Sequence, residues 1–166
     1  MTRRESELMQ PESRESKLKL TKVGRDPGVT SRMMAAVRNK NTRPEVALRS
    51  ALHARGLRYR VHPKHVPGHP DLVWHGLRVA IFVDGDFWHG NAWRIRGLSD
   101  PSLQFPTNTE WWMAKMRRNE ARDAEVNGQL AEEGWAVIRI WESDILANVD
   151  AAAERVMAAL RLARQR

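Results

Sequence analysis

Two carboxylates, two large aromatic side chains and a histidine follow one another in the stretch VDGDFWHGN, residues 83–91. The stretch ends the apolar run VAIFV, which is typical of a buried strand. Carboxylates beside an imidazole can hold a divalent cation or move a proton, and exposed aromatic rings can stack on bases. The same residues could instead form a buried turn that completes a core.

Hydrolysis of a phosphodiester with Mg²⁺ needs oxygen ligands that converge on one ion, usually one or two carboxylates and a backbone carbonyl. The sequence offers Glu45, Asp71 and Asp84, together with the carbonyl of Val83. Asp71 opens one expected strand, Asp84 ends the next, and a tight turn near Gly76 joins the two. This order predicts that Asp71 shares an ion with Val83 or Asp84 at one edge of a sheet, with Glu45 nearby.

Each candidate residue also has a structural interpretation. Asp71 could be a turn acid, and Glu45 could serve only to cap its helix. His89 could be a hydrogen-bonded loop histidine, although a titratable ring beside two carboxylates favours proton transfer. Phe87 and Trp88 would point to opposite sides of an extended chain, so at most one of them would belong to the core. The residues alone leave these alternatives open.

The elements that must position these residues follow from local patterns. TRPE, residues 42–45, has the form of a capping box with proline in the first turn, and predicts a helix that runs to residue 55 before Gly56. The other predicted elements are strands at 57–61, 71–75, 77–83 and 136–141 and helices at 109–134 and 150–166. Residues 90–107 have no regular period and are expected to form a loop. This order predicts an α/β fold with a mixed central β-sheet flanked by helices.

The chain of 166 residues is long enough for one core, and we expect a single domain at residues 29–166. Residues 1–28 are polar and contain prolines and glycines, so we expect them to be a flexible basic arm. A short helix with a basic face is predicted at residues 30–41, close to phosphates.

The net charge is +8, and residues 1–66 hold 16 Lys and Arg against 6 Asp and Glu. This asymmetry favours a polyanionic partner, and seven tryptophans in a polar chain suit stacking on nucleic-acid bases. There are no cysteines, which excludes thiolate catalysis, disulfides and a thiolate zinc site. No segment has the apolar length of a membrane span or the apolar core of a signal peptide, so we expect a cytoplasmic protein that associates with the nucleoid.

Five collinear segments between about residues 30 and 145 resemble the very short patch repair DNA mismatch endonucleases, a family of the restriction-endonuclease-like superfamily. They are TSRMMAAVRNKNTRPEVALRSAL, GHPDLV, VAIFVDGDFWHG, TEWWMAKMRRNEARD and GWAVIRIWESDI, in the order and spacing of that family. The resemblance implies a restriction-endonuclease-like core. It also implies Mg²⁺-dependent nicking of one strand at a thymine·guanine mismatch, which leaves a 5′-phosphate and a 3′-hydroxyl and starts very short patch repair.

The resemblance also assigns roles to individual residues. Asp71 matches the metal-binding aspartate, and Val83 matches the position whose carbonyl completes the metal site. His89 matches a histidine that handles the proton of the attacking water or contacts a neighbouring phosphate, and Glu45 matches a helix acid near the site. Asp84 stands where some members have a histidine, and its carboxylate can ligate Mg²⁺ directly.

Aromatic residues at the positions of Phe87, Trp88 and Trp112 insert into the duplex beside the mismatch in that family. Opening a base step costs a few kcal/mol, and it costs least where pairing is already faulty. Further DNA contacts are expected from Trp111, Lys115, Arg118, Arg32, Arg38 and Lys40. The basic residues of the long helix could instead be a solvated face.

Many members of the family build a structural zinc site at positions that match Asp86, Asn91, Trp93 and Ser143. These residues cannot form a cysteine zinc site, so no structural zinc is expected. We expect Asp86 and Asn91 to hold the turn by hydrogen bonds, with Trp93 filling the vacated volume. The remaining histidines show no convincing ligand spacing; they are His53, His62, His65, His69 and His75.

Two other functions are consistent with the residues. One is a restriction-like or defence nuclease of the same fold with a different target, and the other is a catalytically inert DNA-binding module. The expected partners are double-stranded DNA with a mismatch and proteins of the repair pathway. We expect a monomer without membrane contact.

Overall fold

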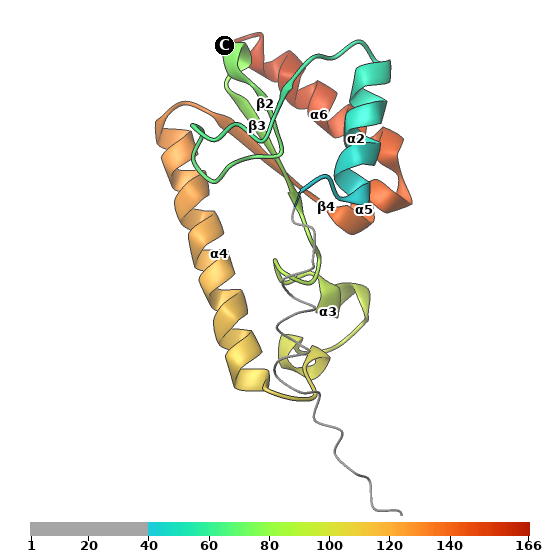
Figure 1. The fold of residues 1–166 in the computed structure, drawn as a ribbon, viewed down its shortest axis with the longest axis vertical. Helices are drawn as coiled ribbons and strands as arrows, with labels where there is room; N and C mark the ends of the chain where they lie inside the picture. Colours follow the sequence, from blue (N-terminus) through green and yellow to red (C-terminus); the bar gives the residue numbers. More distant parts are fainter. Residues whose placement is uncertain (1–39) are drawn as a thin grey trace, which may run out of the picture. The chain divides into compact units, whose positions relative to one another are not determined.

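A mixed four-stranded sheet with helices on both faces forms the centre of the fold (Figure 1). The computed structural model describes residues 40–166. The strands lie side by side in chain order as β1 (Arg60–Val61), β2 (Leu72–Trp74), β3 (Val79–Asp84) and β4 (Ala136–Trp141). β1, β2 and β3 are antiparallel neighbours, whereas β4 runs parallel to β3. The predicted α/β fold with a mixed sheet is confirmed.

The hairpin of β2 and β3 places Asp71 beside the end of β3. The short 3-10 helix η1 (His75–Leu77) makes the expected turn, and the register pairs Leu72 with Ile81. The backbone N–H of Asp71 donates to the carbonyl of Ile81 at 2.9 Å, and a carboxylate oxygen of Asp71 accepts the N–H of Val83 at 2.7 Å. The predicted proximity of Asp71 and Val83 is therefore confirmed.

One face of the sheet is covered by α2 (Arg43–Ala54), α5 (Glu142–Ala147) and α6 (Val149–Ala163) (Figure 1). The predicted capping box begins α2, and this helix buries Leu48 and Leu52 in the larger core. Burial of such a side chain contributes roughly 1.5–3 kcal/mol. The sequence patterns did not predict α5, a helix of 6 residues that starts directly after β4.

The opposite face of the sheet is covered by α4 (Thr109–Glu132) (Figure 1). A second core on this side contains Ala80, Phe82 and Leu130, whereas Ile81 lies in the core on the α2 side. Successive residues of β3 therefore face opposite sides of the sheet, as the pleat requires. Because of this alternation, neighbouring residues at the end of β3 also face opposite sides of the sheet.

Two expectations about the connecting segments are wrong. Residues 90–107 are not only a loop, because they contain α3 (Ala92–Ile95) and the 3-10 helix η2 (Pro101–Gln104). The first strand has 2 residues instead of five, and the chain turns directly after it at His62, whose φ is 45°. The helix predicted at residues 30–41 lies mostly outside the described residues, as do Arg32 and Arg38. None of the helices that the structure describes is long and apolar enough to cross a membrane.

Candidate active site

Glu45, His62 and Asp71 form a cluster on the α2 side of the sheet, in which one ligand atom of each residue lies within 4.8 Å of the others. Nε2 of His62 is 3.5 Å from Oε2 of Glu45, and Nδ1 of His62 is 3.6 Å from Oδ1 of Asp71. We call these three residues the α2-side cluster. The predicted meeting of Glu45 and Asp71 is confirmed.

Local structure fixes the carboxylate of Glu45 within this cluster. It accepts hydrogen bonds from the backbone N–H of Asn41 at 2.9 Å and from the hydroxyl of Thr42 at 2.8 Å. These bonds satisfy groups at the start of α2 that have no partner within the helix. Glu45 is only 5% exposed. It therefore caps α2 and also belongs to the α2-side cluster.

The α2-side cluster carries negative charge that its surroundings do not balance well. The pKa of Asp71 is raised to about 7, chiefly by burial and also by the neighbouring carboxylates of Glu45 and Asp84, while the N–H of Val83 acts in the opposite direction. Burial also lowers the pKa of His62. Nε2 of His62 is buried and has no hydrogen-bond partner among residues 40–166. Two carboxylates and an unpartnered imidazole nitrogen are a donor set that fits a divalent cation.

The interpretation of His62 as one of several scattered histidines is wrong. The antiparallel register pairs Val61 with Leu72, so the next residue along β1 lies beside Asp71. The backbone N–H of His62 donates to the carbonyl of Asp71 at 3.2 Å. The strand pairing was the signal that could have placed His62, because spacing along the sequence does not reveal a neighbour on another strand.

A second cluster lies on the α4 side of the sheet and comprises Asp84, His89, Asp123 and Arg139; we call it the α4-side cluster. Nδ1 of His89 is 2.5 Å from Oδ2 of Asp123. The guanidinium of Arg139 bridges the two carboxylates, at 2.8 Å from Asp84 and 3.2 Å from Asp123. A carboxylate only accepts hydrogen bonds, so Nδ1 of His89 must carry the shared proton.

Arg139 is itself held in place by its neighbours. Its Nε donates to the side-chain oxygen of Asn127 at 3.1 Å, and its guanidinium lies 4.6 Å from the centre of the Phe82 ring. The sequence patterns predicted neither Arg139 nor Asp123 as a site residue. Asp123 follows Asn119 by one turn of α4, and the Asn119 side chain donates to the carbonyl of Trp88, so this face of α4 adjoins the VDGDFWHGN segment.

Asp84 does not belong to the α2-side cluster. The sequence had offered its side chain, as an alternative to the carbonyl of Val83, as the partner that shares an ion with Asp71. Its side chain is buried against Arg139, and its Oδ1 lies 3.9 Å from Nδ1 of His89. The pleat of β3 explains this placement, because Asp84 and Phe82 share the α4 side. Asp84 still acts on Asp71 through its charge, which helps to raise the pKa of that carboxyl.

Five aromatic residues form a cluster between the end of β3 and the start of α4: Phe87, Trp88, Phe105, Trp111 and Trp112. The Trp112 ring centre lies 5.3 Å from that of Phe87 and 6.3 Å from that of Trp88. Phe87 and Trp88 are both half-buried and both reach the cluster, because residues 86–90 form a turn and not an extended strand. The expectation that they point to opposite sides is therefore wrong.

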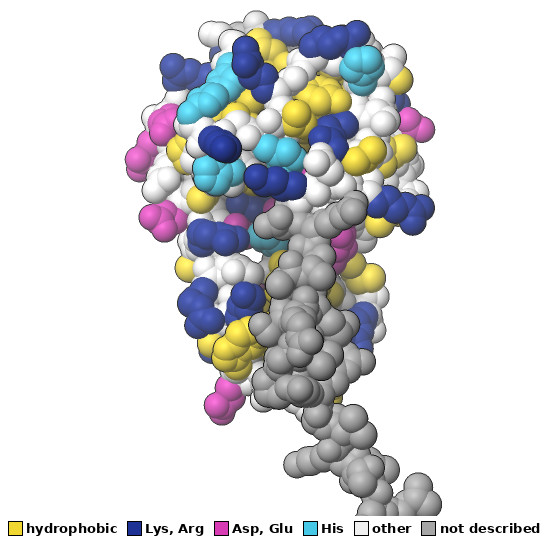
Figure 2. All heavy atoms as spheres, in the orientation of Figure 1, with side chains coloured by type: hydrophobic (Ala, Val, Ile, Leu, Met, Phe, Trp, Pro, Cys, Tyr) yellow, Lys and Arg dark blue, Asp and Glu magenta, His cyan; other side chains and the backbone are white. Residues whose placement is uncertain are grey.

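Charged residues border this aromatic cluster. Trp111 is 54% exposed, and the ammonium of Lys115 lies 5.7 Å from the ring centres of both Trp88 and Trp111. Arg118 and Lys40 are exposed. Figure 2 shows that Lys and Arg side chains, with histidines among them, are spread over the visible face of the described residues.

Three of the four positions that match zinc ligands in related proteins are joined by hydrogen bonds. The side-chain amide of Asn91 donates to Asp86 at 2.7 Å, and the hydroxyl of Ser143 donates to the same oxygen at 2.9 Å. The backbone N–H of Ser143 donates to the other oxygen at 3.1 Å. The prediction that Asp86 and Asn91 hold this turn is confirmed. Trp93 is half-buried, and the guanidinium of Arg94 lies 4.8 Å from its ring centre.

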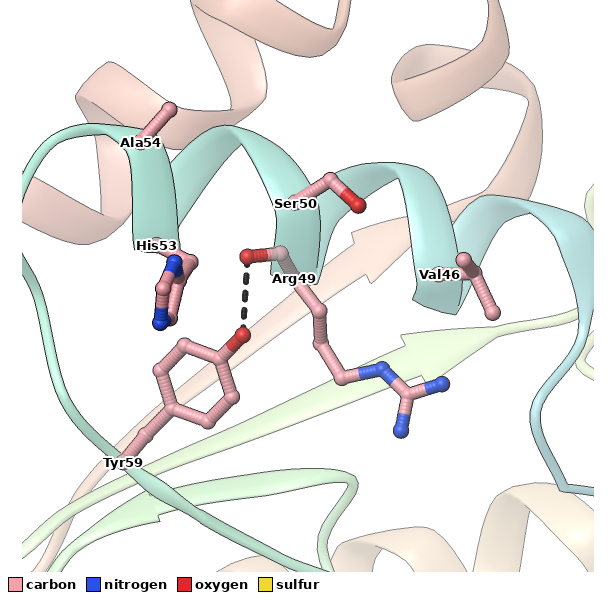
Figure 3. Close-up of a pocket in the computed structure, with 6 residues that line it drawn as sticks. All are labelled: Val46, Arg49, Ser50, His53, Ala54 and Tyr59. Carbon is pink, nitrogen blue, oxygen red and sulfur yellow. Dashed lines mark hydrogen bonds between the residues drawn. The ribbon is translucent and has the colours of Figure 1, made fainter.

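A groove runs along α2 beside Tyr59 (Figure 3). The hydroxyl of Tyr59 donates to the backbone carbonyl of Arg49 across it at 2.7 Å. Arg49 also lowers the pKa of Asp71 through its charge. The groove holds no cluster of ligand residues; its lining is Val46, Arg49, Ser50, His53, Ala54 and Tyr59.

This mixed sheet with its flanking helices is the fold of restriction-endonuclease-like proteins. A family model described as DNA mismatch endonuclease Vsr matches residues 25–95. The Type II nicking enzyme V.NmeDIP of Neisseria meningitidis serogroup C is 42% identical over 135 residues, which cover 81% of this chain and 88% of that protein. The chain therefore belongs to the Vsr family of DNA mismatch endonucleases.

Two further relatives support the same assignment. The Type II nicking enzyme V.HpaIIP of Haemophilus parainfluenzae is 40% identical over 116 residues, or 70% of this chain and 79% of that protein. The DNA mismatch endonuclease Vsr of Escherichia coli is 35% identical over 117 residues, or 70% of this chain and 71% of that protein. The protein is a hydrolase that acts on DNA as a nicking endonuclease.

Proposed function

We propose that the protein nicks one strand of duplex DNA at a mismatch, with thymine opposite guanine as the preferred one, and that Mg²⁺ assists the reaction. The observation that carries the proposal is the position of three groups around the end of β3: the α2-side cluster, the α4-side cluster and the aromatic cluster. A metal site, a proton-transfer group and a surface that can stack on bases would then meet at one phosphodiester.

In this proposal Asp71, Glu45 and the backbone carbonyl of Val83 hold the cation. The residues fit a divalent ion, because the two carboxylates repel each other and a buried imidazole nitrogen beside them has no partner. When bound, the ion supplies charge stabilisation at the phosphate and lowers the pKa of a coordinated water. Asp84, which is paired with Arg139, contributes charge to the site and is not a ligand.

His89 is the proposed proton-transfer group. Its Nδ1 is bound to Asp123, which fixes the tautomer and the orientation of the ring. Nε2 is then the atom that can take a proton from the attacking water or contact the phosphate. Arg139 forms ion pairs with both Asp123 and Asp84 and is a positioning residue in this scheme. The products are a 5′-phosphate and a 3′-hydroxyl.

The aromatic cluster supports selectivity for faulty base pairs. Phe87, Trp88 and Trp112 are half-buried and pack on one another, so their exposed edges form a preassembled apolar surface. Insertion of such side chains opens a base step at a cost of a few kcal/mol, and that cost is lowest at a mismatch. Lys115, Trp111 and Arg118 lie on α4 and Lys40 lies before α2. In this proposal these residues contact the DNA backbone. We extend the phosphate contacts to Arg32 and Arg38.

The decisive experiment is a single-turnover nicking assay with Mg²⁺ on matched duplexes and on duplexes with a thymine·guanine mismatch. The wild-type protein should nick the mismatched duplex faster. Trp88→Ala and Trp112→Ala should lose this preference, since base stacking is worth roughly 1–3 kcal/mol per base. Trp135→Ala is the matched control, because Trp135 is half-buried but lies outside the aromatic cluster. It should change both rates in the same proportion.

Several relatives are named Type II nicking enzymes, and this favours one alternative, a nuclease whose target is a fully paired site. Equal or faster nicking of the matched duplexes would establish that alternative and contradict the mismatch proposal. Tight binding of both duplexes without nicking would contradict both proposals. Melting temperatures of the tryptophan variants separate a loss of DNA stacking from a loss of core packing.

A further inference from the structure

His62 occupies its place in the α2-side cluster at an energetic cost. Its φ of 45° lies in the left-handed region, which is unfavourable for a residue with a side chain. The backbone N–H of His62 is bound to the carbonyl of Asp71 at 3.2 Å, so this conformation turns the ring beside the Asp71 carboxylate. The side chain of His62 is only 16% exposed.

Neither ring nitrogen of His62 makes a hydrogen bond that would account for this position. The distances of 3.5 Å to Glu45 and 3.6 Å to Asp71 exceed the range of about 2.7–3.2 Å for N–H···O bonds. Nε2 is buried without a partner, which is itself costly. An imidazole binds a cation through one nitrogen, and one ligand atom of each of Glu45, His62 and Asp71 lies within 4.8 Å of the others. This spacing suits ligands of one cation, since metal bonds of about 2.1 Å place neighbouring ligands roughly 3–4 Å apart.

We infer that His62 is a nitrogen ligand of the cation held by Glu45 and Asp71, and that the site therefore binds first-row transition ions such as Mn²⁺ more tightly than Mg²⁺. This inference rests on the proposed metal site. Imidazole is a ligand for first-row transition ions, whereas Mg²⁺ takes oxygen ligands and keeps several of its waters. In the α4-side cluster, by contrast, the carboxylates of Asp84 and Asp123 are already bridged by Arg139.

The test uses Mn²⁺ as the probe, on the full chain without DNA. Pulsed electron paramagnetic resonance detects a nitrogen nucleus that is directly bound to Mn²⁺, and isotopic labelling of histidine identifies its source. Wild-type protein should show a histidine coupling, and His62→Gln should lose it while an oxygen donor remains. His53→Ala is the matched control, because His53 is an exposed histidine on the same helix as Glu45 (Figure 3). It should keep the coupling.

Titrations with Mn²⁺ and Mg²⁺ give a second readout. His62→Gln should weaken Mn²⁺ binding at least about tenfold and Mg²⁺ binding much less, so that the preference for Mn²⁺ falls. A wild-type signal without histidine coupling, or a coupling that persists in His62→Gln, would overturn the inference and leave the proposed function intact. Absence of both Mn²⁺ and Mg²⁺ binding, with or without duplex DNA, would instead contradict the proposed metal site. His62→Ala, checked for folding by circular dichroism, should reproduce the loss.

Discussion

The α2-side and α4-side clusters differ in how their charges are balanced. On the α4 side, Arg139 bridges Asp84 and Asp123, so each carboxylate has a cationic partner, and His89 is bound to Asp123. On the α2 side, Asp71 faces Glu45, and the ring nitrogens of His62 make no hydrogen bond to either carboxylate. The two clusters contain similar residue types and lie at the end of one strand. The carboxylates of the α4-side cluster are nevertheless paired with a cation, whereas those of the α2-side cluster are not, within the described part of the chain.

This difference indicates that the two clusters have different functions. A cluster with balanced charges is rigid, and it holds an imidazole in one orientation, which suits proton transfer. A cluster with excess negative charge and a free donor becomes favourable only when it binds a cation. Two successive residues of β3 contact the two clusters separately, because the backbone N–H of Val83 donates to Asp71 whereas the side chain of Asp84 accepts from Arg139.

The largest effect is expected from Asp71→Asn, which removes a proposed ligand and keeps an oxygen that can accept the Val83 N–H. Nicking should become unmeasurable, since loss of several kcal/mol of charge stabilisation lowers the rate roughly 10³-fold or more. Duplex affinity should be nearly unchanged. Single-turnover nicking and a binding titration on the same preparation check this. A variant that retains turnover would remove Asp71 from the metal site.

His89→Ala should slow nicking by roughly 10²–10⁴-fold, the usual effect of removing an acid or base. Binding of the metal ion should not change, because His89 belongs to the α4-side cluster. Measurement of metal affinity and nicking rate for this variant and for Asp71→Asn therefore separates the two clusters. A parallel loss of metal binding in His89→Ala would mean that they are one site.

Arg139→Met should lower kcat by roughly 10–100-fold with little change in KM for DNA. This is the effect expected for a residue that orients functional side chains and does not itself contact the substrate. The variant leaves the carboxylates of Asp84 and Asp123 without their common partner. Adding Asp84→Asn should restore part of kcat, because it removes one of the two uncompensated charges. Arg161→Met is the control, since Arg161 is exposed near the end of α6. If the double variant is no faster than Arg139→Met, charge balance is not the role of Arg139.

The last prediction concerns the stability of the metal-free protein as a function of pH. The folded-state pKa of Asp71, about 7, lies above its ordinary value of 3.8. The stability that protonated Asp71 contributes is therefore complete below pH 3.8 and is lost as the pH rises toward and through about 7. Each pH unit in this window costs up to about 1.4 kcal/mol.

Urea unfolding at several pH values, with a chelator present, measures this loss. Asp71→Asn cannot ionise, so its stability relative to the wild type should rise with pH up to about 7 and then stay level. A constant difference between the two proteins across this range would contradict the electrostatic contrast between the clusters.

Local patterns predicted the parts of the site that depend on neighbours in sequence. The hairpin turn predicted that Asp71 lies beside Val83, and the capping box placed Glu45 at the start of α2. Both follow from short-range geometry, which a single sequence specifies. The order of strands and helices along the chain, and the mixed sheet flanked by helices, also followed from the periodicity of the segments.

The residues that were missed depend on contacts between distant segments. To predict the position of His62, one needs the register of β1, a strand of 2 residues. To predict the positions of Arg139 and Asp123, one needs the packing of β4 and α4 against β3. The orientation of Phe87 and Trp88 was wrong because the chain turns where an extended strand was assumed. No local periodicity carries this information.

The hydrogen bonds around Asp86 bear on how the folded loop depends on zinc supply and on oxidants. The loop that carries His89 is tied to the start of α5 by side chains that are present as soon as the chain folds, namely Asn91, Asp86 and Ser143. A thiolate zinc centre would have to acquire an ion, and it would be open to chelators and to oxidation of its sulfur ligands. The sequence has no cysteine, so this anchor requires no zinc supply and offers oxidants no thiolate to attack.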